Sequence, residues 1–291
     1  MHNRRGIILA GGSGTRLHPL TVSITKQLMP IYDKPLIYYS ISCLMLSKIR
    51  DILLISTPNH IELFEKLLGD GSQWGINIQY KVQNKPEGIA QALILSEQFL
   101  QGSPSLLILG DNIFYGDKLS QRLQETSQNN ESTIFVHQVN NPGDYGVAKL
   151  DKNNKVVDIV EKPTTYIGNW VVTGLYFYDN DASNYAKELK PSSRGELEIT
   201  DLNKSYLALN KLNVEFLGRG FTWLDTGTHD NLLEASNFIS TIQKRQGFMV
   251  CCPEEIAFRN KWIDENKLEQ LINNYKNTDY GLYLQYMLIN S

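Results

Sequence analysis

The sequence predicts an α/β protein built around a Rossmann-like, doubly wound mixed sheet, and three observations support this fold class. Apolar strand-like runs alternate with segments of helical apolar spacing through the first half of the chain. A glycine-rich turn follows the first run, which ends near Leu9, and Asp111 follows a later run. Open α/β sheets bind ligands beyond the carboxyl ends of their strands, so both positions predict a site at one sheet edge.

The expected elements follow from the spacing of the apolar residues. In the first half, we expect strands at residues 7–10, 52–56, 76–82 and 105–109, and helices at 35–46, 61–68 and 90–100. Beyond residue 130 the pieces become shorter and β-rich. Residues 146–150 and 156–160 predict a hairpin, because the turn between them carries Asn where positive φ is tolerated. A strand is expected at 171–178, followed by helices near 199–209, 229–246, 268–275 and 280–289.

The domain organisation is expected to be simple. No stretch rich in Pro, Gly or Ser separates these segments, and no internal repeat is present. We therefore expect one domain over residues 1–291, with an α/β part over about 1–130, a β-rich part over about 131–228 and a helical part over about 229–291. Tyr280, Tyr283 and Tyr286 form an aromatic helix face that packs on the same subunit or on a partner.

Composition limits the partners and the compartment. The net charge of −3, from 28 basic and 31 acidic residues, predicts no attraction to nucleic acid or anionic membrane. No apolar run approaches the length of a membrane span, and the first residues lack the pattern of a signal peptide. Cys43, Cys251 and Cys252 are odd in number and have no metal-binding spacing. They are typical of reduced thiols, so a cytoplasmic location is expected.

The glycine-rich turn at residues 11–14 predicts a phosphate site, because its backbone amides can approach a ligand closely. Arg16 and Lys26 follow it and add two positive charges. The turn is no P-loop, since no Lys follows its last glycine, and no dinucleotide motif, since Leu17 stands where a third small residue belongs. The alternative is a tight turn in which both charges are solvated at the surface.

Two carboxylates end apolar runs more than a hundred residues apart. Asp111 follows one run, and Asp225 ends another. Mg²⁺ prefers one or two carboxylates together with phosphate oxygens, so this pair predicts a magnesium site beside the glycine turn. The alternative is that each Asp binds backbone amides at a turn, with Asp225 helping to cap a helix that begins near Thr228.

The order of the motifs carries a specific resemblance. From about residue 5 to about 260 the chain resembles the sugar-1-phosphate nucleotidyltransferases, and among them the glucose-1-phosphate thymidylyltransferases. The resemblance rests on the glycine turn and on residues 26–35, 82–83, 86–92, 110–112, 145–147, 160–163, 172–176, 194–201 and 223–228. It implies the nucleotide-diphospho-sugar transferase fold, with nucleotide bound by the first part of the chain and sugar by the second.

The resemblance also implies a reaction. A Mg²⁺-dependent enzyme would transfer dTMP from dTTP to glucose 1-phosphate, giving pyrophosphate and dTDP-glucose, the first step towards dTDP-deoxysugars such as dTDP-rhamnose. Arg16 and Lys26 would be catalytic, and Asp111 and Asp225 would hold the metal. The nucleotide would contact Leu9, Gly11, Gly12, Gly14, Thr15, Arg16, Gln27, Gln83, Pro86, Gly88 and Asp111. The sugar phosphate would contact Tyr145, Gly146, Glu161, Lys162, Val172 and Trp223.

Individual residue types suit these roles. Base choice would rest on Gln83 and Gly88. A glutamine amide complements the O4 and N3–H edge of thymine, and uracil shares that edge, so some use of UTP is expected. Pro163 favours extended backbone at Lys162. The resemblance further implies a homotetramer with a second, regulatory nucleotide-sugar site at an interface. That site would contain Tyr115, Gly116, Arg219, Glu255 and Arg259.

Three alternatives remain open at this point. Within the class, the chain would use another base or an amino sugar 1-phosphate. Outside it, the chain would be a non-catalytic regulatory subunit that binds nucleotide sugars, or a Rossmann dehydrogenase, which Leu17 disfavours.

Overall fold

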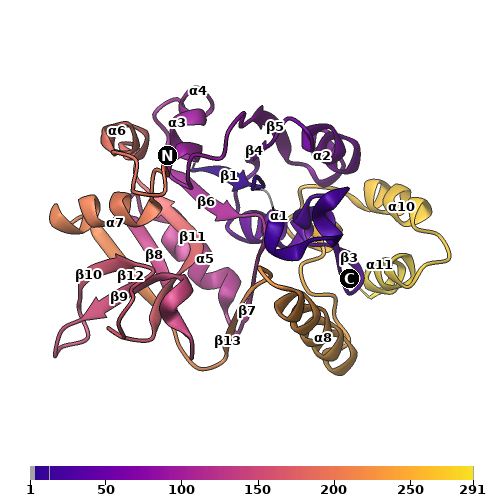
Figure 1. The fold of residues 1–291 in the computed structure, drawn as a ribbon. Coiled ribbons are helices and arrows are strands. Elements are labelled where there is room, and N and C mark those ends of the chain that lie inside the picture. The colour runs from indigo at the N-terminus through magenta and orange to yellow at the C-terminus, as the bar shows by residue number, and fades with distance from the viewer. Residues whose placement is uncertain (1–3, 13, 291) are drawn as a thin grey trace.

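A nine-stranded mixed sheet forms the centre of the molecule (Figure 1). The computed structural model describes residues 4–12 and 14–290. The main path of the sheet runs β10-β9-β11-β6-β1-β4-β5, with β8 beside β11 and β12 beside β8. Its strands are β1 (Arg5–Leu9), β4 (Asp51–Ser56), β5 (Asn77–Val82), β6 (Ser105–Leu109), β8 (Ser132–Gln138), β9 (Gly146–Leu150), β10 (Val156–Glu161), β11 (Trp170–Tyr178) and β12 (Leu212–Leu217).

The amino-terminal part of the sheet is parallel, and its strands β1, β4 and β6 are buried on both faces. β1 pairs in parallel with β4 and β6, and β4 pairs in parallel with β5. Adjacent residues of β1 point to opposite sides, so Ile7 and Ile8 belong to different apolar clusters, both with no exposed surface. The predicted fold class is confirmed.

Helices cover the two faces. The cluster around Ile8 includes residues of α1 (Ile37–Leu46), α2 (Ile61–Leu68), α5 (Leu119–Gln128) and the carboxyl-terminal helices. The cluster around Ile7 includes residues of α3 (Gln91–Leu95), α4 (Glu97–Leu100), α6 (Ala182–Glu188) and α7 (Ile199–Ala208). Among the described residues, no helix is long and apolar enough to cross a membrane.

The expected β-rich hairpin is present. β9 and β10 pair antiparallel, and Asn154 in the turn between them has a φ of 60°. Two small sheets stand apart from the main one: the β2 (Pro30–Ile31) and β3 (Lys34–Pro35) pair, and the β7 (Asn112–Gly116) and β13 (Phe221–Asp225) pair.

Some boundaries differ from the expectations. The helix expected at 90–100 is two helices, because Ser96 lies between them and its hydroxyl donates to the carbonyl of Leu93 at 3.1 Å. Residues 35 and 36 precede α1, since Pro35 pairs in β3. The strands β7, β8, β12 and β13 and the helices α5, α6 and α9 have no counterpart among the expected elements. The three-part division of a single domain stays a prediction.

The carboxyl-terminal helices are α8 (His229–Gln246), α9 (Pro253–Arg259), α10 (Glu265–Asn274) and α11 (Asp279–Ile289). Two tyrosines of the expected aromatic face contact the same subunit. The hydroxyls of Tyr280 and Tyr283 donate to Glu254 and Glu255, both at 2.5 Å. Tyr286 is 67% exposed, so only part of this face is covered within the described chain.

Candidate active site

A two-stranded ribbon brings the two predicted metal ligands together. β7 begins one residue after Asp111, and β13 pairs with it antiparallel so that Asp225 lies opposite Asn112. Thr226 holds this end of the ribbon, because its amide and its hydroxyl donate to the backbone carbonyl of Asp111 at 3.4 and 3.0 Å. Two carboxylates that are distant in sequence therefore meet at the carboxyl end of β6.

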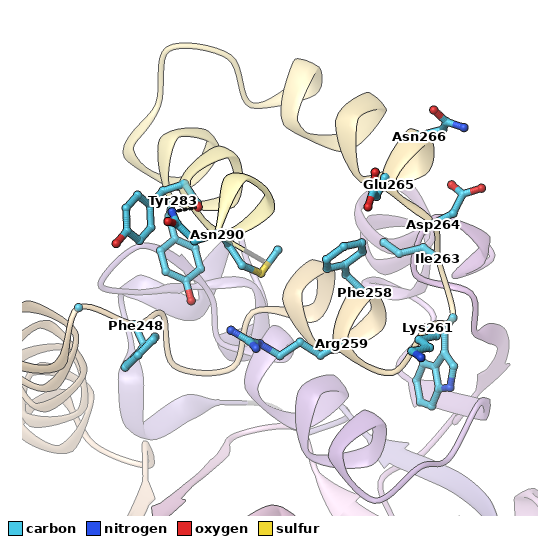
Figure 2. A pocket seen from close by; sticks show the side chains of 14 residues that line it. Phe248, Phe258, Arg259, Lys261, Ile263, Asp264, Glu265, Asn266, Tyr283 and Asn290 are labelled. Carbon is cyan, nitrogen blue, oxygen red and sulfur yellow. Dashed lines mark hydrogen bonds between the residues drawn. The ribbon is translucent and has the colours of Figure 1, made fainter.

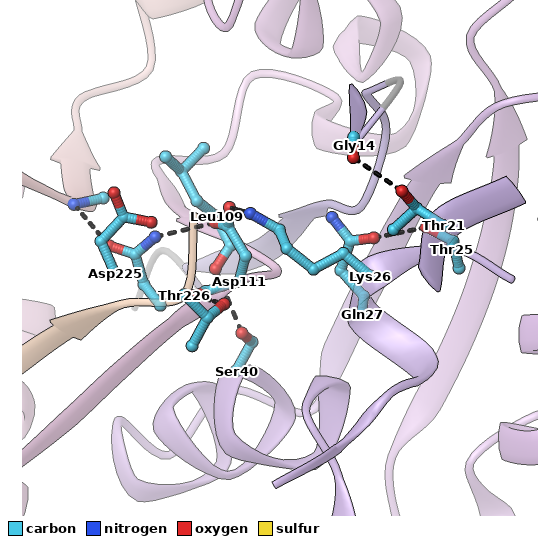
Figure 3. A network of polar contacts seen from close by, with 12 residues as sticks. Gly14, Thr21, Thr25, Lys26, Gln27, Ser40, Leu109, Asp111, Asp225 and Thr226 are labelled. Carbon is cyan, nitrogen blue, oxygen red and sulfur yellow. Dashed lines mark hydrogen bonds and ion pairs between the residues drawn. The ribbon is translucent and has the colours of Figure 1, made fainter. Parts of the chain in front are cut away.

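Lys26 neutralises one of these carboxylates (Figure 3). Its ammonium group pairs with Asp111 Oδ2, and the two side chains are only 11% and 21% exposed. The Asn112 amide donates to Asp111 Oδ1 at 2.8 Å. Burial opposes ionisation of Asp111, but the ion pair with Lys26 and this hydrogen bond outweigh it and lower the pKa of the carboxyl. The alternative of Lys26 as a solvated surface charge is wrong.

Asp225 has the opposite electrostatic environment. Burial and the neighbouring charge of Asp111 raise its pKa, and the hydroxyl of Tyr145 donates to its Oδ2 at 3.3 Å. Burial and the charge of Asp225 raise the pKa of Tyr145 to about 12, which keeps that hydroxyl protonated. The helix cap is Thr228, whose hydroxyl accepts from the Asn231 amide at 3.2 Å, so the capping alternative for Asp225 is wrong.

The glycine turn lines a cavity of about 230 Å³. Gly12 and Gly14 have φ values of 115° and 58°, in the region that side chains disfavour, and Thr21 fixes the turn by donating to the Gly14 carbonyl at 2.7 Å. Ser13 lies outside the described residues. The cavity lining is Gly11, Gly12, Gly14, Thr15, Arg16, Leu17, Lys26, Gln27, Asp111 and Gly227.

A second cavity, of about 280 Å³, adjoins the first. Arg16, Asp111 and Gly227 line both of them. A Cβ atom on Gly227 would stand 3.1 Å from Arg16 Nη2 and 3.2 Å from Asp225 Oδ1, so a glycine leaves the space between these charged groups open. All the residues expected at the sugar phosphate line this cavity: Tyr145, Gly146, Glu161, Lys162, Val172 and Trp223.

The β9–β10 hairpin carries the polar end of the second cavity. Glu161 ends β10 opposite Gly146. Its two oxygens are both engaged, because the Thr200 hydroxyl donates to Oε2 at 2.5 Å and Arg194 Nη2 lies 3.3 Å from Oε1. The carboxylate therefore has a fixed orientation at the cavity wall.

The expectation of extended backbone at Lys162 is wrong. Its φ is +42°, in the left-handed region. The Lys162 amide donates to the Tyr145 carbonyl at 3.0 Å, one residue beyond the β9–β10 ladder. This tertiary hydrogen bond overrides the local preference that Pro163 imposes.

Four of the residues expected to contact the nucleotide lie outside the linings of both cavities. Among the described residues, neither cavity is lined by Leu9, Gln83, Pro86 or Gly88. Gln83 is 2% exposed, and its Oε1 lies 2.6 Å from the point where a Cβ on Gly11 would stand. Gln83 therefore lies directly behind the glycine turn.

Several residues of the site carried no role in the sequence-based predictions. Asn112 joins three parts of the wall: besides Asp111, its Oδ1 accepts from Trp223 Nε1 at 2.6 Å and from the Gly174 amide at 3.2 Å. Thr226, Arg194 and Thr200 were also missed as site residues. All four lie inside the motifs of the family resemblance, which was the available signal, but their partners depend on the fold.

Four of the five expected regulatory residues lie beside the carboxyl-terminal helices (Figure 2). Tyr115 and Gly116 line one groove, Arg259 lines a larger one of about 1230 Å³, and Phe248 lines both. Figure 2 shows Arg259 extending from α9 toward Phe248. Glu255 accepts from Arg259 Nε at 2.7 Å, whereas Arg219 is exposed in the turn before β13 and lines neither groove in the described chain.

Comparisons with known proteins show the family of this chain. The family model described as nucleotidyl transferase matches residues 5–242. The chain is 58% identical to the glucose-1-phosphate thymidylyltransferase of Xanthomonas campestris pv. campestris, covering 98% of this chain and 97% of the relative. It is 48% identical to that of Mycobacterium tuberculosis, covering 98% and 99%.

Solved structures agree as well. A Bacillus anthracis structure assigned as a glucose-1-phosphate thymidylyltransferase, in complex with sucrose, superposes with a TM-score of 0.74 at 40% identity, covering 81% of this chain and 94% of that one. A UDP-glucose pyrophosphorylase complexed with UDP-glucose shares the fold, with a TM-score of 0.71 at 23% identity and coverage of 82% and 98%. The dehydrogenase alternative is therefore wrong. The chain is a nucleotidyltransferase and belongs to the glucose-1-phosphate thymidylyltransferase family.

Proposed function

We propose that this chain performs its family's reaction, the transfer of dTMP from dTTP to glucose 1-phosphate, at the boundary of the two cavities. One observation carries the proposal. Lys26, Asp111 and Asp225 meet where the glycine-turn cavity adjoins the cavity of Glu161 and Lys162. The dTTP phosphates would occupy the first cavity and glucose 1-phosphate the second, so the α-phosphorus would lie between them.

The residues present suit a magnesium ion. Among the described residues there is no cluster of three or more His, Cys, Asp or Glu side chains that could enclose a metal. Mg²⁺ does not need one, because it binds through one or two carboxylates together with substrate phosphates and water. Burial and then the charge of Asp111 raise the pKa of Asp225, and a divalent cation would relieve the repulsion between the two carboxylates. Asp111 and Asp225 would hold the ion, which when bound neutralises charge on phosphate oxygens.

The protein's own groups would position the reactants. The backbone of the glycine turn and Arg16 would bind the triphosphate, and Lys162 would bind the phosphate of the sugar substrate. An oxygen of glucose 1-phosphate then forms a bond to the α-phosphorus, while the bond to the bridging oxygen breaks and pyrophosphate leaves. The attacking phosphate is already ionised near neutral pH, so charge neutralisation and in-line positioning matter more than a general base.

Lys26 would move between two partners in this scheme. Without substrate it neutralises Asp111. With dTTP bound, its ammonium would face the α-phosphoryl group and stabilise the charge that develops there. Glu161 would accept hydrogen bonds from sugar hydroxyls, in the orientation that Thr200 and Arg194 give it.

The remaining features are proposed on the same basis. We propose a cytoplasmic homotetramer whose second nucleotide-sugar site uses Tyr115, Gly116, Arg219, Glu255 and Arg259, and whose product feeds dTDP-deoxysugars such as dTDP-rhamnose. The lining of the large groove by Arg259 and exposed aromatic residues supports the second site.

A substrate matrix tests the proposed function. Each of dTTP, UTP, dCTP and ATP is combined with glucose 1-phosphate, galactose 1-phosphate and glucosamine 1-phosphate, with and without Mg²⁺, and pyrophosphate release is measured. We expect the highest kcat/KM for dTTP with glucose 1-phosphate, lower activity with UTP and none without metal. Absence of pyrophosphate release from every pair would instead support the non-catalytic regulatory subunit.

A further inference from the structure

A chain of side-chain hydrogen bonds lies behind the glycine turn. Gln83 Nε2 donates to Gln91 Oε1 at 2.6 Å, and the backbone amide of Glu87 donates to the same oxygen at 3.2 Å. On its other side, Gln91 Nε2 donates to Glu87 Oε2 at 2.6 Å. Gln91 begins α3, and Gln83 and Glu87 belong to the segment that joins β5 to α3.

Glu87 determines which way each of these amides points. A backbone N–H can only donate, so the Gln91 atom that faces it must be the oxygen. A carboxylate can only accept, so the Gln91 atom that faces the Glu87 side chain must be the nitrogen. Because Gln91 then presents an oxygen to Gln83, the Gln83 atom that faces it must be its NH₂ group.

The oxygen of the Gln83 amide points toward the glycine turn. Its Oε1 stands 2.6 Å from the position of a Cβ on Gly11, and Gly11 lines the glycine-turn cavity. Gln83 is 2% exposed, so water does little to reorient the amide. The side chain therefore presents an acceptor, and not a donor, toward the turn.

Glu87, which orients both amides, is itself held in place by backbone hydrogen bonds. The Glu87 carbonyl accepts from the Leu197 amide at 2.7 Å, and the Leu197 carbonyl accepts from the Ala90 amide at 3.2 Å. Gly88 permits this contact, because a Cβ there would stand 2.4 Å from the Leu197 carbonyl oxygen. Two backbone hydrogen bonds thus hold Glu87 and the start of α3 in place.

We infer that Gln91 is a positioning residue for base selection, which locks the Gln83 amide so that its oxygen faces the base. The inference rests on the proposed function, with the base beside Gln83 as the family resemblance implies. Thymine and uracil carry an N–H at ring position 3 and can donate to this oxygen. Cytosine has a lone pair there, so it would set one acceptor against another in a buried site. Gln91 thereby selects thymine and uracil over cytosine by whether N3 of the ring donates or accepts a hydrogen bond.

Gln91→Leu tests the inference, because it removes the acceptor that orients Gln83 and leaves the amide free to turn. The kcat/KM values for dTTP, UTP and dCTP with glucose 1-phosphate are measured for each variant. We expect the dCTP/dTTP ratio to rise about tenfold, the change that one hydrogen bond of about 1.4 kcal/mol makes. The UTP/dTTP ratio should not change, since both bases carry the same N3–H, and a general loosening of the site would alter it.

Two further variants check that Gln91 sets the orientation of the Gln83 amide. The double variant Glu87→Gln with Gln91→Glu exchanges the two side chains. The carboxylate at position 91 still accepts from Gln83, and the amide at position 87 now donates to that carboxylate. This variant should therefore keep the wild-type dCTP/dTTP ratio. Gln91→Lys presents only donors and still pairs with the Glu87 carboxylate. It should turn the Gln83 amide around and raise the dCTP/dTTP ratio at least as much as Gln91→Leu.

Unchanged dCTP/dTTP ratios in both Gln91→Leu and Gln91→Lys, with dTDP-glucose still formed, would overturn the inference and leave the proposed function standing. If Gln91→Leu does not fold, Gln91→Lys decides alone by the same ratio. Failure of the wild-type protein to use dTTP at all would instead refute the proposed function.

Discussion

The ion pair between Lys26 and Asp111 makes the sharpest prediction about the site. We consider Lys26→Met, which keeps an unbranched chain of similar length but removes the charge. The variant leaves Asp111 with the Asn112 amide as a donor at 2.8 Å and with no ammonium group beside it. Its carboxylate would stay largely desolvated, because its side chain is only 21% exposed.

The expected magnitude lies between two limits. Breaking a fully buried ion pair costs about 3 to 5 kcal/mol, and losing an exposed pair costs about 0 to 1 kcal/mol. The side chains of Lys26 and Asp111 are 11% and 21% exposed, and Asp111 keeps its hydrogen bond from Asn112. Lys26→Met should therefore lower the free energy of unfolding by about 2 kcal/mol. For a chain of 291 residues that lowers Tm by about 3 °C. Turnover should fall by about 100-fold or more, as for loss of one preorganised charge-stabilising group.

Urea unfolding of the substrate-free protein measures this cost, and Asp111→Asn supplies the control. Since Asp111→Asn removes the unpaired charge, the double variant should be more stable than Lys26→Met alone and equally inactive. The cost should also depend on pH. The folded-state pKa of Asp111 is lowered, so the pair stabilises the fold above the ordinary pKa of about 3.9, and that stabilisation is lost as pH falls through the lowered value. A Lys26→Met protein with wild-type turnover, or with a stability loss that persists at low pH, would refute this reasoning.

Three more predictions follow from single contacts. In EDTA, Asp225→Asn should stabilise the fold at pH values above the raised pKa of that carboxyl and not below its ordinary pKa of about 3.9, because the stability of the wild-type fold falls as the carboxyl ionises. The same change should lower Mg²⁺-dependent activity at least ~100-fold, and a variant less stable than wild type above the raised pKa would contradict this. Gly88→Ala should cost about 2 to 5 kcal/mol by denaturant unfolding, from a φ of +102° and a Cβ 2.4 Å from a carbonyl oxygen. Gly102→Ala, with a φ of +73° and open space, is the matched control and should cost about 1 kcal/mol. Thr200→Val should raise KM for glucose 1-phosphate about 5-fold, because Glu161 loses a 2.5 Å hydrogen bond, and an unchanged KM would speak against that role.

The parts of the site that the sequence predicts are those coded by local pattern. The glycine turn follows a buried strand, and Asp111 follows another, so the rule for open α/β sheets was enough to place both at one edge. Lys26 lies close in sequence to the turn and was recognisable by its spacing. The family resemblance supplied the residues of the second cavity.

The parts that the sequence does not predict depend on tertiary pairing. Asp225 reaches Asp111 only because β13 pairs with β7 in one register, which no local pattern specifies. The left-handed backbone of Lys162 results from a hydrogen bond across the hairpin, against the preference of its neighbour. The orientation of the Gln83 amide is likewise set by side chains four to eight residues away. In each case a long-range or side-chain contact overrides what the adjacent residues favour.

The β7–β13 ribbon also sets the order in which the site can form during synthesis. Asp225 is added 114 residues after Asp111 (225 − 111). At about 5 to 20 residues per second, a nascent chain spends about 6 to 23 s with the first carboxylate made and the second still absent. Lys26 and β6, the strand before Asp111, precede this interval in the chain, and β7 is made at its start. The ion pair can therefore satisfy the charge of Asp111 in the growing protein well before the ribbon closes and brings the second carboxylate beside it.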